Sequence, residues 1–281
     1  MTDAQRQRAF QKAIAQQLRE QGALVKQTRE SLLAILTTIS EQITVLLAAQ
    51  PSDYQQWFLP QINAQIKTVL QGLQRQGETI LDVALNDASA AGLAQLDNAL
   101  RPAGVLLGGV APAINMQLLT NIKAFHVNRI ADITTRTASA IEIELSKVLI
   151  GAQSPYDATK AIQAIMGDAP RYRIKTIVNT SMSSVYNKSA ADRYAQASEY
   201  LPGLKKQWHR SGKRDPRLSH YAAHLQAVPT NEPFNIGGVS MMQPHDLTAP
   251  AKETINCGCY MQPLMENWDV KLPAQKLTTA A

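Results

Sequence analysis

The chain has 281 residues, of which 45% are hydrophobic and 18% are charged, and its formal net charge is +6. This composition is that of ordinary soluble globular proteins, so it excludes the disordered and fibrous classes, and the length suits one large or two medium domains. The modest basic excess supports only weak, salt-sensitive attraction to nucleic acid.

No segment is predicted to act as a signal or to enter a membrane. The N-terminus lacks the apolar run of 7–15 residues that a secretory signal needs. The most apolar stretch, residues 102–119, is interrupted by Pro112 and by polar side chains and falls short of a membrane span. We expect a buried helix junction there and no membrane partner.

The first predicted element is a long helix from about residue 4 to residue 49. Its apolar residues recur every seven positions, at Leu18, Val25, Leu32, Ile39 and Leu46, with Leu36 and Ile43 at companion positions. The companion series fails at Gly22 and Arg29. The stripe therefore favours packing within the chain over a dedicated coiled coil.

The next segment, residues 54–100, follows a break at residues 50–53. Pro60, Gly77 and Gly92 punctuate it, so the sequence predicts two or three helices there.

Three further helices are predicted before residue 201. Pro112 opens a long one that ends at Gly151, a residue type common just beyond a helix C-terminus. Ser154 is expected to cap a short helix that has Pro155 in its first turn and ends near Gly167. The last of the three runs from residue 170 to about residue 200.

The final eighty residues differ in composition, since eight of the fourteen prolines lie at or after Pro202. Short extended runs are predicted at 204–209, 227–229 and 260–264, with a short helix at 215–224 and turns at 211–213 and 237–238. The predicted fold is mainly α, with a long-helix N-terminal region followed by a small C-terminal α+β module. The predicted parts are a helical region (1–150), a helical lead-in (151–200) and the module (201–281).

Several motifs between residues 151 and 264 resemble the C-terminal domain of phage minor head proteins, the Mu F-like head-morphogenesis family. In the module they are Lys206-Gln207-Trp208, Asp215 to His220, Pro233-Phe234, Gly238-Val239, Pro244-His245-Asp246 and Ile255 to Cys259. Upstream they are Ser154-Pro155-Tyr156, Arg171, Arg173, Asn179-Thr180-Ser181, Asn187 and Tyr194. The chain departs from the family in having Gly258 where an Arg is common, and Asn179-Thr180-Ser181 where Arg-Thr-Glu is common.

The resemblance implies a minor structural protein of a tailed-phage head. Such proteins attach near the portal inside the head and act in head assembly and in packaging or delivery of DNA. The implied partners are the portal protein, the major capsid or scaffold protein and phage DNA. The implied location is the virion head interior, reached from the host cytoplasm during assembly.

Four residues of the module have the types and spacing of a metal site. His220 and His224 are one helical turn apart, and Cys257 and Cys259 supply two thiolates. Bridging these two cysteines to each other is geometrically awkward, which excludes a disulfide-stapled scaffold and leaves metal ligation or plain thiols. Together the four side chains would make a structural zinc site, with His245 as an alternative fourth ligand. The competing interpretation is that the thiols are small buried apolar groups and the histidines hydrogen-bond locally.

Three charged residues are expected to stabilise the module. Asp215 would cap the short helix, with Pro216 in its first position. Arg217 would pair with Asp246 or Glu253.

A basic cluster is the densest positive run in the chain. Its members are Lys205, Lys206, Arg210, Lys213 and Arg214. It is the candidate contact for DNA phosphates, although solvated side chains on a strand and turn explain it better because no groove-reading motif accompanies it.

An enzymatic role is not expected. An ADP-ribosyltransferase-like enzyme would place its acidic pair after the serine-rich run, whereas Glu142 and Glu144 precede residues 180–183. A metal nuclease needs an open metal position, which a ligand-saturated zinc lacks. A third reading is a DNA-binding protein ejected with the genome.

Overall fold

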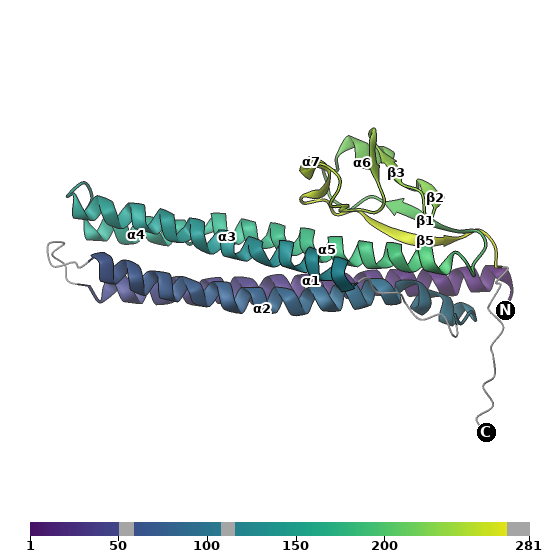
Figure 1. Cartoon of the computed structure of the whole chain (residues 1–281), viewed down its shortest axis with the longest axis horizontal. Helices are drawn as coiled ribbons and strands as arrows, with labels where there is room; N and C mark the ends of the chain where they lie inside the picture. Colours follow the sequence, from purple (N-terminus) through teal and green to yellow (C-terminus); the bar gives the residue numbers. More distant parts are fainter. Residues whose placement is uncertain (51–58, 108–115, 269–281) are drawn as a thin grey trace, which may run out of the picture. The chain divides into compact units, whose positions relative to one another are not determined.

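The computed structural model describes residues 1–50, 59–107 and 116–268, and its elements are drawn in Figure 1. The long helices are α1 (Asp3–Ala48), α2 (Leu59–Leu100), α3 (Met116–Leu149), α4 (Pro155–Ile165) and α5 (Asp168–Ala197), with a short 3-10 turn at Arg101–Ala103. The C-terminal elements are β1 (Leu204–His209), α6 (Leu218–Ala222), β2 (Ala227–Pro229), β3 (Phe234–Ile236), β4 (Val239–Met241), α7 (Ala251–Thr254) and β5 (Tyr260–Met265). The predicted fold class, mainly α with a small C-terminal α+β module, is confirmed.

By packing, the chain divides into two compact units whose boundaries fall inside α1, α2, α3 and α5. The sheet-bearing unit combines Met1–Leu24, Leu85–Thr120 and Asn179–Ala281, and the all-helical unit combines Val25–Ala84 and Asn121–Val178. The predicted division of the chain near residues 150 and 200 is a division by sequence into parts with different roles. The packing units do not test it, so it stays a prediction.

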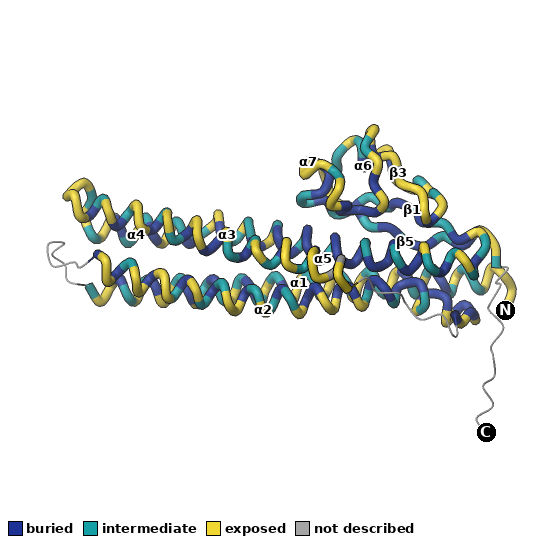
Figure 2. The backbone as a smooth tube through the Cα atoms, in the orientation of Figure 1, coloured by how far each residue is buried: buried dark blue, intermediate teal, exposed yellow. Residues whose placement is uncertain are grey.

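Helix α1 confirms the first predicted element almost to the residue. In the all-helical unit Leu32, Leu36, Ile39 and Ile43 are buried, as the stripe predicts, and the buried positions recur along the helix in Figure 2. The seven-residue series fails at both ends: Leu18 and Val25 are only half-buried, and Leu47 is buried instead of Leu46. The reason is that an α-helix of 3.6 residues per turn drifts by about 20° per heptad from a seven-residue repeat.

Helix α1 is also long and apolar enough to cross a membrane, by length and composition alone. Its most apolar 18-residue window has a mean hydropathy of 1.6, and 28% of that window is buried. A core helix of a soluble protein meets the same criterion, so this is weak evidence, and the absence of a membrane partner stays an expectation.

The expected breaks in the second segment are wrong, because α2 is one continuous helix from Leu59. Pro60 lies in its first turn, where a missing N–H is harmless. The two glycines lie where other helices approach closely: a Cβ atom at Gly77 would be 3.0 Å from Ile130 Cγ2, and one at Gly92 would be 2.3 Å from the Tyr186 carbonyl oxygen. Glycine here permits close helix packing and does not end the helix.

The predicted ends of α3 and α4 are confirmed. Gly151 has a φ of +71° and follows α3, and the Ala152 N–H donates to the Lys147 carbonyl at 2.9 Å. Ser154 Oγ accepts from the Asp157 N–H at 3.1 Å and so caps α4. The predicted opening at Pro112, and residues 108–115 of the apolar stretch around it, lie outside the described residues.

The sheet-bearing unit has a three-stranded antiparallel sheet of order β2-β1-β5 and a separate β3-β4 hairpin. Gly237 and Gly238 turn that hairpin with φ values of +59° and +87°, which confirms the predicted turn. Residues alternate along β1, so that Leu204, Lys206 and Trp208 are buried.

One hydrophobic core joins this sheet to helices from distant parts of the sequence. It includes Phe10 and Ile14 of α1, Leu96 and Leu100 of α2, Ala190 and Tyr194 of α5, and Trp208, Phe234 and Met261 of the strands. Polar contacts reinforce the α2–α5 packing: Arg193 donates to both carboxylate oxygens of Asp97, at 2.8 and 2.6 Å. The N-terminal part of α1 and the C-terminal part of α2 therefore belong to the framework that supports the C-terminal strands.

Gly92 lies in a close helix contact, whereas Gly22 has open space around it, and the two positions give a matched pair of predictions. Replacing Gly92 by Ala should lower the free energy of unfolding by about 2 kcal/mol, since a methyl group there collides with backbone that cannot swing aside. Replacing Gly22 by Ala, in α1 with open space around it, should raise the free energy by about 1 kcal/mol because alanine is the better helix former. Urea unfolding of both variants tests this, and equal effects would contradict it.

Candidate metal centre

Two short segments of the sheet-bearing unit bring three potential metal ligands together. Helix α6 supplies His220, and the turn between α7 and β5 supplies Cys257 and Cys259. Asn256 turns the chain with a φ of +55°, a conformation that asparagine tolerates better than most residues. Its N–H donates to Thr180 Oγ1 of α5 at 3.3 Å, which fixes the turn against the helix.

The ligand atoms of His220, Cys257 and Cys259 all lie within 4.8 Å of one another, and all three residues are buried. His220 Nδ1 is 3.3 Å from Cys259 Sγ and 3.4 Å from Cys257 Sγ. A tetrahedral metal with bonds of about 2.0 Å to nitrogen and 2.3 Å to sulfur would hold such atoms roughly 3.5 Å apart. The group therefore has the donor types and the spacing of a metal centre.

Glu253 of α7 orients the histidine. Its Oε2 atom lies 2.9 Å from His220 Nε2, which leaves Nδ1 for the sulfur atoms. A carboxylate on the far nitrogen is the usual companion of a metal-bound imidazole, because it fixes the ring and raises its basicity. From the sequence, Glu253 was expected only as a partner of Arg217. Its position four residues before Cys257 does not by itself indicate a contact with His220.

The electrostatics of the group favour one thiolate. The Cys257 thiol beside it and the His220 ring lower the pKa of Cys259 to about 5, against the effect of burial. The same contact with Cys259, together with burial, raises the pKa of Cys257. Burial lowers the pKa of His220, but the contacts with Cys259 and Glu253 outweigh it and the net shift is upward. At neutral pH the group thus already holds a negative sulfur.

His224 does not belong to this group, which corrects the predicted four-ligand set. Helix α6 ends at Ala222, so the one-turn spacing from His220 is not realised. The exposed His224 ring instead accepts from the Arg210 N–H at 3.4 Å and packs against His209.

His245, the alternative fourth ligand, is buried but lies outside the three-residue group. Neither of its ring nitrogens has a hydrogen-bond partner of normal geometry among the described residues. Burial, and then the charge of Lys213, lower its pKa to about 3, so the ring is neutral at physiological pH.

The three predicted stabilising residues have other roles than expected. Asp215 is exposed and caps nothing, because α6 begins at Leu218 with Arg217 at the cap position and no side-chain cap. Arg217 donates to the Ile255 carbonyl at 2.6 Å rather than to Asp246 or Glu253. Asp246 accepts from the Met242 N–H at 2.8 Å and from the Thr248 N–H at 3.0 Å, and so holds the loop after β4.

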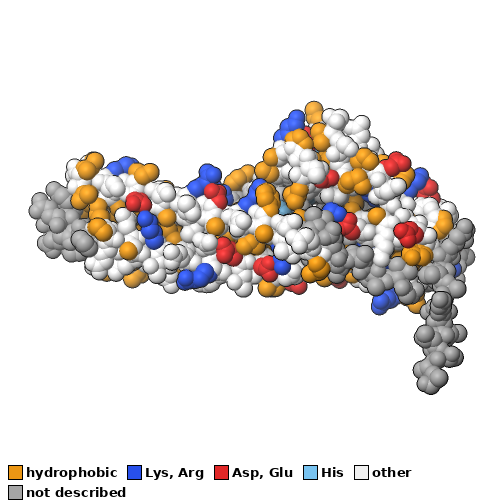
Figure 3. Space-filling model, in the orientation of Figure 1, with side chains coloured by type: hydrophobic (Ala, Val, Ile, Leu, Met, Phe, Trp, Pro, Cys, Tyr) orange, Lys and Arg blue, Asp and Glu red, His pale blue; other side chains and the backbone are white. Residues whose placement is uncertain are grey.

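The basic cluster does not form one patch. Lys206 is buried, donates to the Met242 carbonyl at 2.8 Å and lies over the Phe234 ring, so it cannot contact a phosphate. Lys205 pairs with Glu266 at 2.7 Å, Lys213 donates to the Asn256 carbonyl, and Arg210 lies over the Tyr221 ring. Only Arg214 is exposed with no contact of this kind among the described residues. On the face drawn in Figure 3, basic side chains lie interspersed with acidic ones.

Comparison with known proteins finds a distant relative. The chain is similar to an uncharacterized protein, YqbB, of Bacillus subtilis (strain 168), with 24% identity over 173 residues. The match covers 59% of this chain and 56% of that protein, so the chain spans little more than half the length of the relative. No family model matches the chain, and no solved structure matches it.

The burial of Lys206 predicts a pH dependence of stability. Burial lowers the pKa of Lys206 to about 8, from an ordinary value of 10.5, against smaller opposing effects of Asp246 and Glu232. Between these two values the unfolded chain binds a proton that the folded chain has lost. Stability should therefore rise with pH across this window, by at most about 3 kcal/mol.

Urea unfolding between pH 7 and pH 10.5 tests this in the wild type and in Lys206→Met. Other groups that titrate in this range are common to both proteins, so the difference between the two curves isolates Lys206. The wild type should gain stability relative to the variant as the pH rises. Parallel curves would contradict this prediction, because they would show that folding does not lower the pKa of Lys206.

Proposed function

We propose that the chain is a minor structural protein of a tailed-phage head, bound near the portal and acting in head morphogenesis and in packaging or delivery of DNA. The resemblance to the Mu F-like family motivates this proposal. The observation that carries it is that several motif residues from separate parts of the sequence contact one another in the sheet-bearing unit.

Hydrogen bonds join the upstream and downstream halves of the resemblance. Thr180 accepts from the Asn256 N–H, and Asn187 Oδ1 accepts from the Met261 N–H at 3.2 Å. Within the downstream half, the Trp208 ring packs edge-on against His220 and Phe234, with centroid distances of 5.6 and 5.3 Å. Motif residues used in this way support a fold, which favours a structural protein over an enzyme.

The transferase alternative finds no support in the acidic pair. Glu142 pairs with Lys67 at 3.3 Å and Glu144 pairs with Lys147 at 2.7 Å, so both carboxylates serve ion pairs on helices. The ejected DNA-binding protein remains the competing structural role, and it differs in where the protein is found after infection.

Assembly partners test the proposal directly. We expect the full chain to co-purify with the portal protein encoded by the same genome, and mass spectrometry of purified heads to find it in a few copies per head. Absence from heads that contain the portal would contradict the proposal. Recovery inside the infected cell together with the injected DNA would favour the ejected-protein alternative.

Docking is proposed for residues 1–150, but truncation at Gly151 would also remove Phe10, Leu96 and their neighbours from the core of the sheet-bearing unit. Substitution of exposed apolar residues avoids this problem. Leu149→Ser with Ile150→Ser, at the C-terminal end of α3, should weaken portal binding at least about tenfold, as expected for apolar anchors of an interface. Leu218→Ser on α6, also strongly exposed, is the matched control and should bind normally.

The metal centre is proposed to bind structural zinc through His220 Nδ1 and the sulfur atoms of Cys257 and Cys259. Soft thiolates with an imidazole are the donor set that zinc prefers. Water or His245 fills the fourth position, and Glu253 holds the imidazole. A metal here would tie α6 to the turn before β5, which adds folding free energy to a module with short strands.

Zinc content and affinity provide the test. The purified chain should hold one zinc, which His220→Ala or Cys257→Ser removes and which His224→Ala retains. Glu253→Gln should weaken zinc binding about 10- to 100-fold. Because a proton on His220 competes with the metal and its pKa is raised, zinc affinity should fall as the pH drops, and the fall should begin at a higher pH than for an ordinary histidine. Well under half an equivalent of zinc, with a wild-type melting temperature for Cys257→Ser, would show that the thiols are packing groups.

A further inference from the structure

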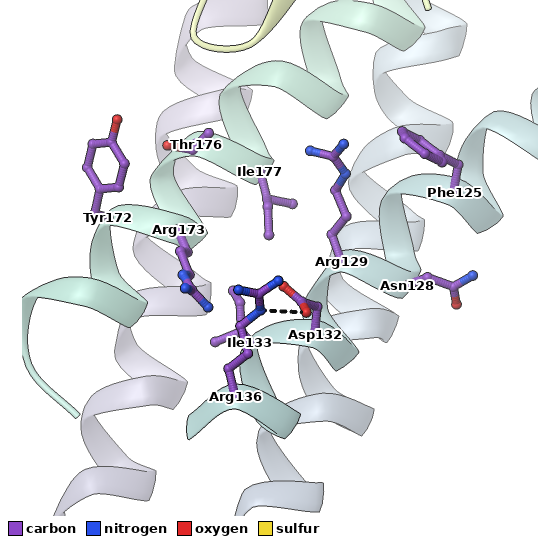
Figure 4. A pocket seen from close by; sticks show the side chains of 10 residues that line it. All are labelled: Phe125, Asn128, Arg129, Asp132, Ile133, Arg136, Tyr172, Arg173, Thr176 and Ile177. Atoms are coloured by element: carbon purple, nitrogen blue, oxygen red, sulfur yellow. Dashed lines mark hydrogen bonds and ion pairs between the residues drawn. The ribbon is translucent and has the colours of Figure 1, made fainter. Parts of the chain in front are cut away.

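A groove in the all-helical unit lies between α3 and α5 and has a volume of about 560 Å³. Figure 4 shows its lining: Phe125, Arg129, Asp132 and Arg136 come from α3, while Tyr172 and Arg173 come from α5. Its size is that of a pocket for a small molecule or one unit of a polymer.

The groove carries an excess of positive charge. Three guanidinium groups face one carboxylate, and that carboxylate, Asp132, is already paired with Arg136 at 2.8 Å. No carboxylate in the described part of the chain pairs with Arg129 or Arg173. Since arginine stays protonated at any physiological pH, both charges are available to an anion. The buried His126 beside them adds no charge, because burial and then Arg129 lower its pKa to about 4.

Exposed aromatic rings flank these cations. Phe125 is 48% exposed and Tyr172 is 63% exposed, one on each helix that forms the groove. The Arg129 guanidinium lies 4.8 Å from the centre of the Phe125 ring, so the cation and the flat apolar surface are presented together. The buried side chains of Ile133 and Ile177 also line the groove.

Guanidinium groups beside exposed rings suit a ligand that has both an anionic group and a flat face. The guanidinium group of an arginine recognises phosphate by charge and by geometry. Aromatic rings stack on nucleobases with little dependence on sequence. An acidic peptide would use the charges but not the rings.

We propose that this groove binds a nucleotide unit, with phosphate groups held by Arg129 and Arg173 and the base stacked on Phe125 or Tyr172. The site is distinct from the predicted basic cluster, and it goes beyond the proposed head function, since portal binding and zinc binding do not depend on it. Free nucleotides and nucleotides linked in a single strand share this chemistry.

Fluorescence anisotropy of the full chain with a labelled single-stranded DNA of roughly 12 nucleotides tests the site. Arg129→Gln with Arg173→Gln should weaken binding at least about tenfold and reduce the slope of log affinity against log salt by about 1.4, the value for two phosphate contacts on a single strand. Phe125→Leu with Tyr172→Leu should weaken binding about 5- to 100-fold and leave the salt slope unchanged. The matched control, Arg29→Gln with Arg75→Gln, removes equal charge from the same unit and should bind like the wild type.

Competition identifies the source of the nucleotide. Displacement of the strand by millimolar thymidine monophosphate supports the site and shows that free nucleotides suffice, whereas displacement only by unlabelled strand supports it and shows that linked nucleotides are needed. Three results would overturn the proposal. They are no strand binding at about 50 mM salt, unchanged affinity in Arg129→Gln with Arg173→Gln, or displacement by polyglutamate together with normal binding in Phe125→Leu with Tyr172→Leu.

Discussion

The buried face of β1 is the constraint on which the candidate metal centre depends. Trp208 on that face packs between the rings of His220 and Phe234, and Lys206 on the same face lies over Phe234. Strand β5, paired with β1 in register from Leu204 to His209, begins directly after the cysteine turn. The position of the histidine and that of the thiols are therefore set by one strand and its neighbours. A metal would link side chains that this strand and its neighbours bring together.

The same strand face ties the C-terminal motifs to helices at the start of the chain. Phe10 and Leu96 belong to the core that contains Trp208, and Asp97 is bonded to the buried Arg193 of α5. Burial of that arginine is tolerated because both carboxylate oxygens of Asp97 pair with it. The N-terminal helices thus serve the module as well as the proposed portal docking, and a variant that disturbs one role can disturb the other. Exposed substitutions are needed to separate them.

Periodicity and capping residues predicted the helices well, since these signals are local. The stripe of α1 and the caps at Gly151 and Ser154 are examples. The glycines of α2 were misread because their reason is a helix brought close by the tertiary fold, which no local pattern reveals. Three of the four predicted ligands, His220 and the Cys-x-Cys pair, follow from residue type and lie together. The loss of His224 depends on where α6 ends, and the contact of Glu253 with His220 depends on the tertiary fold. Lys206 lies at a buried position of β1, where residues alternate between buried and half-buried. It was assigned to the exposed basic cluster because a lysine is usually exposed.

The contacts among motif residues are the basis of the proposed structural role, and the groove between α3 and α5 is the proposed site for a nucleotide. The claim at the centre of this account is that His220, Cys257 and Cys259 form one metal site held by the sheet-bearing unit. X-ray absorption at the zinc edge of the full-length protein tests it most directly. The account predicts two sulfur neighbours at about 2.3 Å and two nitrogen or oxygen neighbours at about 2.0–2.1 Å. A shell of nitrogen and oxygen alone, or of four sulfurs, would contradict it.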